Sequence, residues 1–182
     1  MKQLNPALFS SVKMDWATPQ AFFDALDTEF HFTLDPCATA ENAKCGKFYT
    51  IADNGLDQDW CGETVFCNPP YGRAIYDWVF KCWRESRKPG TTVVLLIPAR
   101  TDTRYFHEFI YRRAREIRFI RGRLRFGDGA APAPFPSIGC RLLSNACMET
   151  FLKALFLTTE ILSLLSAPNT ILKTLKSDNE YR

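Results

Sequence analysis

The sequence predicts an α/β fold with a mostly parallel central sheet flanked by helices. Three observations predict it. Short apolar runs alternate with amphipathic segments through the first 126 residues. The segment TTVVLLIP, residues 91–98, is almost continuously apolar between turn signals, as is typical of a parallel strand covered on both faces. The 182 residues, 46% of them hydrophobic, suffice for one substantial core.

The first predicted element is a helix. Thr18 and Pro19 suit its start, because the hydroxyl can cap free N–H groups and proline fits the first helical position. Phe22, Leu26 and Phe30 then recur at helical spacing. The other predicted elements are, in chain order, strands over 30–35, 47–50 and 63–67, a helix over 75–83, the strand over 91–98, a helix over 103–113, a strand over 116–120 and a strand or hairpin over 122–126.

Charge is distributed unevenly along the chain. Residues 1–70 carry 4 Lys/Arg against 10 Asp/Glu, whereas residues 71–126 carry 14 against 5. Seven arginines fall between Arg112 and Arg125. A solvated helix and strand surface can have this composition, but so dense a cluster repels itself without a polyanionic partner. The pattern therefore favours contact with nucleic acid.

Several classes of protein are disfavoured by the sequence. The seven cysteines include no CxxC pair and the two histidines lie far apart, so we expect neither a disulfide framework nor a bound metal. No apolar run reaches the roughly 18 residues that a membrane span needs, and the first residues lack the apolar core of a secretion signal. We therefore expect no membrane association and a location in the cytoplasm.

Two polar side chains stand at the ends of predicted strands. Asp35 ends the strand over 30–35, and Asn68 follows the strand over 63–67. Asp-Pro and Asn-Pro are also common turn formers, so either residue alone has an ordinary structural explanation. Parallel sheets bind ligands at the carboxyl ends of their strands, and the joint placement of the two residues at that edge favours a functional site.

The tetrapeptide Asn68, Pro69, Pro70 and Tyr71 suits one kind of chemistry. An exocyclic amino group of a nucleobase is a poor nucleophile, because its lone pair is delocalised into the ring. The Asn68 side-chain oxygen and the following carbonyl can accept hydrogen bonds from that amino group while it attacks an electrophilic methyl. The prolines hold these acceptors rigid, and the Tyr71 ring offers a face on which an extruded base can stack.

An ordered set of motifs carries a resemblance. The motifs are DWATPQAFFDAL, FTLDPCATAENAKC, DNGLDQDW, VFCNPPYG, LLIPARTDTRYFH, IRGRLRF and APFPS, within residues 13–137. Together they resemble the phage-type DNA N6-adenine methyltransferases, which use S-adenosylmethionine (SAM). The resemblance implies a compact, Rossmann-like SAM-dependent methyltransferase fold. Only 33 residues separate Asp35 from Asn68, which leaves no room between them for a separate target-recognition domain. It also implies a phage or prophage gene expressed in a bacterial host.

The resemblance implies roles for particular residues. It makes Asn68, Pro69, Pro70 and Tyr71 the catalytic motif. Residues implied to bind the cofactor are Trp16, Thr18, Pro19, Asp35, Pro36, Cys37, Ala38, Asp53 and Leu56, with Asp57 or Asp59 as substitutes for Asp53. The glycine-rich FxGxG of the wider class is absent, so the methionine part of SAM must be held differently. Residues expected to contact double-stranded DNA are Arg100, Arg104, Arg112, Arg113, Arg121, Arg123 and Arg125.

The chain departs from the family after APFPS. A strand normally returns to the sheet there, whereas this sequence favours an amphipathic helix from about 147 to 165. We expect a methyltransferase domain over 1–138 and a divergent helical segment over 139–182. Two interpretations remain open, a genuine helical extension or the loss of the last strand.

Three functions remain open from the sequence. The first is site-specific methylation of adenine N6 in DNA. The second is the same transfer to another amino group, namely cytosine N4, an RNA base or a protein glutamine. The third is a catalytically silent DNA-binding homologue. The recognition sequence and the oligomeric state are not predicted.

Overall fold

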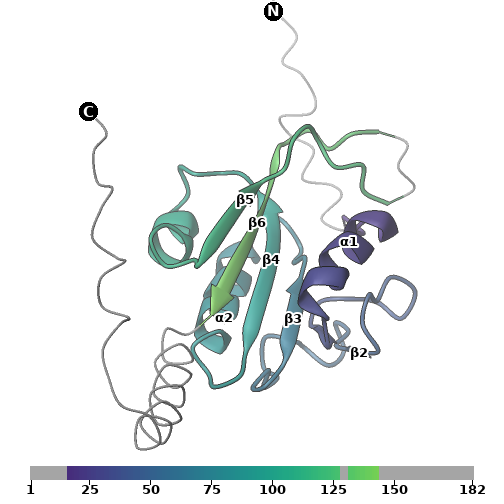
Figure 1. Ribbon diagram of the computed structural model, residues 1–182, viewed down its shortest axis with the longest axis vertical. Helices are drawn as coiled ribbons and strands as arrows, with labels where there is room; N and C mark the ends of the chain where they lie inside the picture. The colour runs from purple at the N-terminus through teal and green to yellow at the C-terminus, as the bar shows by residue number, and fades with distance from the viewer. Residues whose placement is uncertain (1–15, 128–130, 144–182) are drawn as a thin grey trace, which may run out of the picture. The chain divides into compact units, whose positions relative to one another are not determined.

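The computed structural model describes residues 16–127 and 131–143, which lie in the first of two compact units, Met1–Asn145. Six strands form one sheet in the order β2-β1-β3-β4-β6-β5 (Figure 1). The strands are β1 Leu34–Asp35, β2 Lys47–Phe48, β3 Thr64–Cys67, β4 Thr92–Pro98, β5 Glu116–Phe119 and β6 Ser137–Leu143. The helices are α1 Gln20–Phe30, α2 Ile75–Glu85 and the π-helical turn η2 Phe106–Ile110.

The sheet is mostly parallel, which confirms the predicted fold class. β2, β1, β3 and β4 pair in parallel, and Thr64–Cys67 runs in register with Thr92–Leu95. β6 lies antiparallel to both β4 and β5, so β5 points the same way as β4. The carboxyl ends of five strands therefore meet at one edge of the sheet.

Alternation along the strands divides the core between the two faces of the sheet. Val65 and Cys67 of β3 pack in the cluster that includes α2 and η2. Phe66, between them, packs instead with Phe23 of α1 and Leu96 of β4. Figure 1 shows α1 and α2 on opposite faces, as this alternation requires. Each face thus buries its own apolar layer, and the strand tips stay at the edge between the layers.

β6 decides whether the sheet has lost its last strand, which the sequence after APFPS left open. Ser137–Leu143 pairs residue by residue with β4, from Ser137 opposite Pro98 to Leu143 opposite Thr92. A strand does return to the sheet, so the interpretation in which it is lost is wrong for the described residues. The domain boundary expected between 138 and 139 falls inside β6, because pairing with β4 continues to Leu143. The helix expected from about 147 to 165 lies outside the described residues.

Several predicted elements differ in extent. The strand expected over 30–35 is reduced to Leu34–Asp35, because α1 continues to Phe30 and His31 takes a left-handed conformation (φ 54°) that turns the chain. The helix expected over 103–113 is a single π-helical turn. Residues 122–126 form neither a strand nor a hairpin. They belong to a loop over 120–136, in which the Leu124 carbonyl accepts a 2.8 Å hydrogen bond from the Ala133 N–H.

A buried ionic cluster fixes the segment that precedes β3. Glu85 at the end of α2 is fully buried and accepts hydrogen bonds from Lys81 Nζ at 2.9 Å and from the Trp60 N–H at 3.1 Å. Lys88 Nζ lies 2.6 Å from the second carboxylate oxygen of Glu85. Burial raises the pKa of Glu85, but the bonds from these partners lower it overall. The carboxylate therefore stays charged and ties the 53–61 segment to α2.

Candidate active site

A cavity opens at the carboxyl ends of β1 and β3. Asp35 ends β1 and Asn68 follows β3 directly, so both predicted strand-end residues reach the same cavity. The lining residues are Trp16, Ala17, Thr18, Asp35, Cys37, Asn42, Lys44, Phe66, Asn68, Pro69 and Pro70. Seven of these were expected from the sequence to serve catalysis or cofactor binding, and the other four were not.

The Asn68 amide is held at three points. Its Nδ2 donates to the Trp16 carbonyl and to Thr18 Oγ1, the latter at 2.9 Å. Its Oδ1 accepts a 2.8 Å hydrogen bond from the Tyr71 hydroxyl. A main-chain carbonyl can only accept, so the amide nitrogen must be the atom that faces Trp16. The carbonyl oxygen of Asn68 is thereby fixed on the opposite side, with one of its two acceptor positions used by Tyr71.

Tyr71 is buried rather than displayed. Only 8% of the residue is exposed, and its ring packs edge-on against Phe135 at 5.4 Å and Phe126 at 6.4 Å between centroids. Burial raises the pKa of Tyr71, so its hydroxyl stays protonated and donates to Asn68 at any ordinary pH. The open ring face expected for stacking a base is not present in this structure. The hydroxyl of Tyr71 instead holds the Asn68 amide.

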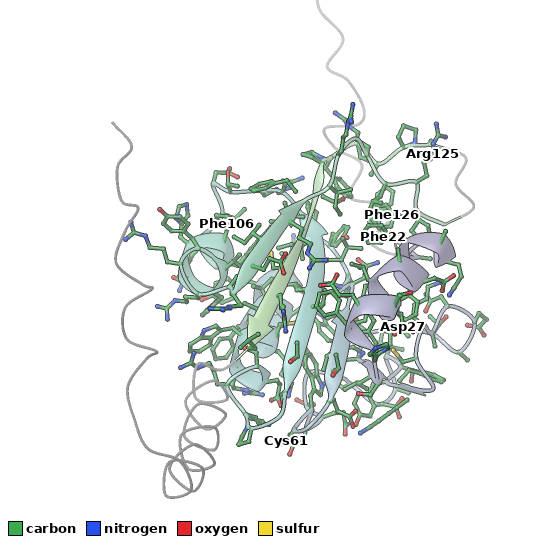
Figure 2. All side chains as sticks on the ribbon, in the orientation of Figure 1. Phe22, Asp27, Cys61, Phe106, Arg125 and Phe126 are labelled. Atoms are coloured by element: carbon green, nitrogen blue, oxygen red, sulfur yellow. The ribbon has the colours of Figure 1, made fainter. Side chains whose placement is uncertain are left out.

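Aromatic side chains join the cavity to the loop over 120–136. The Trp16 ring packs edge-on against Phe126 at 5.5 Å and Phe135 at 5.3 Å. The Gly127 N–H donates a 2.8 Å hydrogen bond to the Ala17 carbonyl. Figure 2 shows Phe126 directed towards α1 and the neighbouring Arg125 directed outward. The loop therefore packs its aromatic residues on the 16–18 segment while presenting arginine to solvent.

Asp35 supplies negative charge to the cavity wall. It is 5% exposed, and its carboxylate accepts main-chain hydrogen bonds from Cys37 N–H at 3.4 Å and Lys44 N–H at 3.1 Å. Burial raises the pKa of Asp35 to about 6, against the opposing effect of these two bonds. The group is therefore ionised above that pH, and a cation in the cavity would stabilise its charged form.

The loop after Asp35 is fixed by a hydrogen bond to Tyr49, which follows β2, and by the close packing of Gly55 against the Pro36 carbonyl. The Cys37 and Cys67 sulfurs lie 3.8 Å apart, and burial raises the pKa of both thiols, so these are packed rather than reactive groups. Ala38 N–H donates to the Tyr49 carbonyl at 3.0 Å. A side chain at Gly55 would lie 2.0 Å from the Pro36 carbonyl oxygen, so only glycine fits there. Pro36 and Ala38 thus shape the loop from behind and do not line the cavity.

Asp53 and Leu56 lie away from this cavity. The Asp53 carboxylate is exposed and accepts 2.8 Å and 2.7 Å hydrogen bonds from the N–H and hydroxyl of Thr50, which lower its pKa. Leu56 packs against the core on the α2 side. Asp57 bonds Asn54 and Asp59 pairs with Lys88, so the structure gives each of these carboxylates a local partner. Pro19, beside Thr18, is also outside the lining.

Sequence reasoning missed the contribution of the polar loop over 39–46. Asn42 and Lys44 line the cavity because this loop folds back on Asp35, through the Lys44 N–H bond to its carboxylate. Lys44 Nζ also donates to Gln20 Oε1 at 2.7 Å, which ties the loop to the start of α1. Ala17 and Phe66 complete the missed set. The polar composition of 39–46, next to a strand-end aspartate, was the available signal.

Strand register divides the arginine cluster into two groups. Glu116 at the start of β5 stands level with Val94, near the amino end of β4, so Arg112 and Arg113 lie towards the edge opposite the cavity. Phe119 stands level with Ile97, so the residues after it emerge at the cavity edge. The exposed arginines on the cavity side are Arg100, Arg104, Arg121, Arg123 and Arg125.

Arg112 and Arg113, the two arginines towards the edge opposite the cavity, stack on aromatic rings. Arg112 lies 5.3 Å from the Tyr111 ring centroid, and Arg113 lies 5.6 Å from that of Trp83. On the cavity side, Arg104 forms an ion pair with Glu108 at 2.7 Å, and Arg123 donates to the Ala133 carbonyl at 3.3 Å. The arginines between Arg112 and Arg125, which the sequence suggested form one basic surface, therefore lie on two separate surfaces.

Within residues 16–127 and 131–143, no three His, Cys, Asp or Glu side chains are grouped so that they could hold a metal ion. No helix in the same described ranges is long and apolar enough to cross a membrane.

The sequence of the chain is similar to those of known proteins. A family model described as DNA N-6-adenine-methyltransferase (Dam) matches residues 6–147. The chain is 40% identical over 63 residues to the putative methyltransferase YfdM of Escherichia coli (strain K12), covering 31% of this chain and 69% of that protein. It is 33% identical over 96 residues to a DNA N-6-adenine-methyltransferase of Escherichia phage T1, covering 51% of this chain and 39% of the phage protein. The chain thus matches well under half the length of the phage T1 relative.

Proposed function

Because the chain belongs to the DNA N-6-adenine-methyltransferase (Dam) family, we propose that it transfers the methyl group of SAM to N6 of an adenine in double-stranded DNA. The observation that supports this most directly is the fixed Asn68 amide, which lines the same cavity as the buried carboxylate of Asp35. Chemically, a methyl group leaves sulfur, a bond forms to N6, and one N6 proton is released.

The residues of the cavity fit SAM. The cofactor carries positive charge on its ammonium and sulfonium groups, and Asp35 offers a carboxylate that is ionised above about pH 6. Lys44 stands on the same wall and could face the cofactor's own carboxylate. Trp16 and Phe66 supply apolar surface. When bound, SAM supplies the electrophilic methyl group; the protein supplies charge, shape and exclusion of water.

The role of Asn68 is to orient and stabilise the attacking amino group. Its Oδ1 has one acceptor position occupied by the Tyr71 hydroxyl and a second position for a substrate N–H. The Pro69 carbonyl can provide another acceptor, since proline fixes φ of its residue and holds the neighbouring backbone rigid. Positive charge develops on N6 during attack, so acceptors fixed in advance lower the barrier without reorganisation.

Double-stranded DNA is the proposed partner, held at the cavity edge of the sheet. Arg121 and Arg125 are exposed there on the loop that packs on Trp16, and Arg100 is exposed just after β4. Arginines in this position would neutralise phosphates and fix the register of the duplex. An adenine must leave the helix to reach Asn68, as for other enzymes that modify a base.

Methyl transfer from labelled SAM tests the proposal. The full chain is incubated with SAM labelled in its methyl group and with unmethylated double-stranded DNA, and the DNA is digested to nucleosides. Label in N6-methyldeoxyadenosine is the expected result. Label in N4-methyldeoxycytidine, or transfer only to RNA or to protein, would identify a different acceptor, and SAM binding without transfer to any of these would contradict an enzymatic role.

A further inference from the structure

We infer that Thr18 is a positioning residue for the reaction, because its hydroxyl holds the Asn68 amide in the orientation that the Trp16 carbonyl selects. The inference rests on the proposed function, in which Asn68 Oδ1 accepts a hydrogen bond from the substrate amino group. Thr18 is 5% exposed, and its Oγ1 accepts a 2.9 Å hydrogen bond from Asn68 Nδ2 across 50 positions of sequence. The residue acts through Asn68 and has no chemical step of its own.

The ordinary role of a threonine at this place does not account for its hydroxyl. Thr18 stands just before α1, where a hydroxyl usually caps the free N–H groups of the first turn. Here Pro19 is the N-cap residue, and α1 receives no side-chain capping bond. The N–H groups of Phe22 and Phe23 donate instead to the Pro19 carbonyl, each at 3.1 Å. The Thr18 hydroxyl is therefore directed to the catalytic amide and not to its own helix.

Two oxygens hold the nitrogen side of the amide. The Trp16 carbonyl can only accept and sets which way the amide faces, and the Thr18 hydroxyl adds a second contact that holds the amide in that place. An asparagine side chain turned by 180° exchanges its donor and acceptor ends. In the flipped state, Oδ1 would face the Trp16 carbonyl and the Thr18 oxygen, and Nδ2 would face the Tyr71 hydroxyl. The carbonyl of Trp16 then meets another acceptor with no proton between them. Removing the Thr18 oxygen leaves one amide proton without its partner, so the Trp16 carbonyl alone holds the nitrogen side and the position of the amide is less well fixed.

The location of Thr18 also couples the amide to both binding surfaces. Trp16 and Thr18 line the cavity, and Ala17 between them accepts the Gly127 N–H from the arginine-bearing loop. Three consecutive residues thus touch the cofactor cavity, the DNA-side loop and the catalytic side chain. A change at Thr18 should therefore alter the orientation of the Asn68 amide, and with it kcat, more than the affinity for SAM or for DNA.

Three variants test the inference. Thr18→Val removes the hydroxyl at nearly constant shape, and Thr18→Ser keeps it. Thr28→Val in α1 is the matched control, because the Thr28 hydroxyl bonds only the Asp24 carbonyl of its own helix. We expect Thr18→Val to lower kcat by about 10- to 100-fold, the cost of a misplaced catalytic group, with KM for SAM and DNA within about threefold. Thr18→Ser and Thr28→Val should stay near the wild-type kcat.

A second measurement does not depend on turnover. In ¹H–¹⁵N NMR spectra, the Asn68 side-chain NH₂ pair is assigned as the pair that disappears in Asn68→Ala. We expect it to exchange faster with solvent and to shift in Thr18→Val, and to be retained in Thr18→Ser. An Asn68 NH₂ pair unchanged in Thr18→Val, or a Thr18→Val kcat within twofold of wild type, overturns the inference. Absence of methyl transfer by the wild-type protein counts instead against the proposed function, and the NMR comparison still decides the role of Thr18.

Discussion

The Tyr71 hydroxyl donates to Asn68 Oδ1 at 2.8 Å, so the last residue of the NPPY motif holds the first. Within the motif, the two prolines therefore restrict the backbone that follows Asn68, and the Tyr71 hydroxyl orients the Asn68 side chain. Because Phe126 and Phe135 pack edge-on against the phenol ring, the motif is anchored in the apolar layer on the α1 face of the sheet.

Tyr71→Phe should lower kcat while the fold stays intact. The variant keeps the ring and its packing but removes the donor that holds Oδ1, so we expect a loss of about 3- to 30-fold in kcat, from the geometry of the amide alone. Tyr71→Ala should in addition lower the free energy of unfolding by about 3 to 5 kcal/mol, since it empties a buried aromatic site. Steady-state kinetics and denaturant titration separate the two effects. An unchanged kcat in Tyr71→Phe would show that the hydroxyl does not orient the amide during turnover.

Asn68→Ala should abolish catalysis without abolishing cofactor binding. The substitution removes both the proposed acceptor for N6 and the donor to Thr18, and loss of one preorganised hydrogen-bonding group typically costs about 10² to 10³ in kcat. The Asp35 side of the cavity is untouched, so calorimetry should give a Kd for SAM within about threefold of wild type. Methyl transfer at more than a tenth of the wild-type rate would remove Asn68 from the catalytic role.

SAM affinity should fall as pH falls through about 6. The pKa of Asp35 is raised by burial to about 6 in the free protein, so the carboxylate that would face the cationic cofactor is neutralised below that value. Bound cofactor favours the charged form, and its binding therefore releases protons in this range. Calorimetric titrations between about pH 5 and pH 8 measure the effect, and Asp35→Asn should remove it. A Kd for SAM that does not change with pH in the wild-type protein would contradict this placement of the cofactor.

The same pKa predicts how Asp35 affects folding. The native value of about 6 exceeds the usual 3.8, so the native state binds this proton more tightly than the unfolded chain does. The contribution of Asp35 to the free energy of unfolding is fully present below the usual pKa and is lost as pH rises through the native one. Asp35→Asn should flatten that slope in urea titrations of the protein without SAM.

DNA binding should depend on one group of arginines more than on the other. Arg121 and Arg125 follow β5 at the cavity edge, whereas Arg112 and Arg113 precede it towards the opposite edge. Replacing the first pair by alanine should weaken binding and reduce the slope of log K against log salt by about 0.9 for each phosphate that the protein no longer neutralises. The second pair is the matched control in charge. Equal weakening by both pairs of substitutions would indicate that the duplex also binds the α2 and η2 face.

Glu85→Gln should destabilise the protein strongly. Lys81 is 3% exposed and would be left with a neutral partner in a buried site, where breaking such a pair typically costs about 3 to 5 kcal/mol. Because the pKa of Glu85 is lowered in the native state, its contribution is present above the unfolded pKa and is lost as pH falls through the native one. Urea titration at neutral pH measures the destabilisation, which should shrink in acid.

Hydrophobic periodicity predicted the elements that pack through a regular face. α1, α2, β3 and β4 all appear where apolar spacing placed them, because each buries a continuous row of side chains. β6 was missed although Ile138, Cys140 and Leu142 alternate along it, because Gly139 and Arg141 between them obscured the pattern. The π-helical turn at Phe106–Ile110 has no periodic signal of its own.

The site was predictable at its strand ends and not in its hydrogen bonds. Asp35 and Asn68 follow from the rule that ligands meet the carboxyl edge of a parallel sheet. Thr18 was assigned to helix capping and to the cofactor segment, but its hydroxyl partner lies 50 residues away, beyond any local pattern. Lys44 reaches the cavity through the fold of its own loop, which composition alone does not specify.

The position of β6 sets an order on the assembly of this protein during synthesis. β5 is made before β6, yet within the described residues its ladder partner is β6, which itself pairs with β4. A growing chain can form the four parallel strands early, but β5 can join the sheet through its ladder with β6 only after residues 137–143 have left the ribosome. The surface proposed to hold DNA would then be completed together with the cavity, because Phe126 and Phe135 pack on Trp16 in the cavity wall.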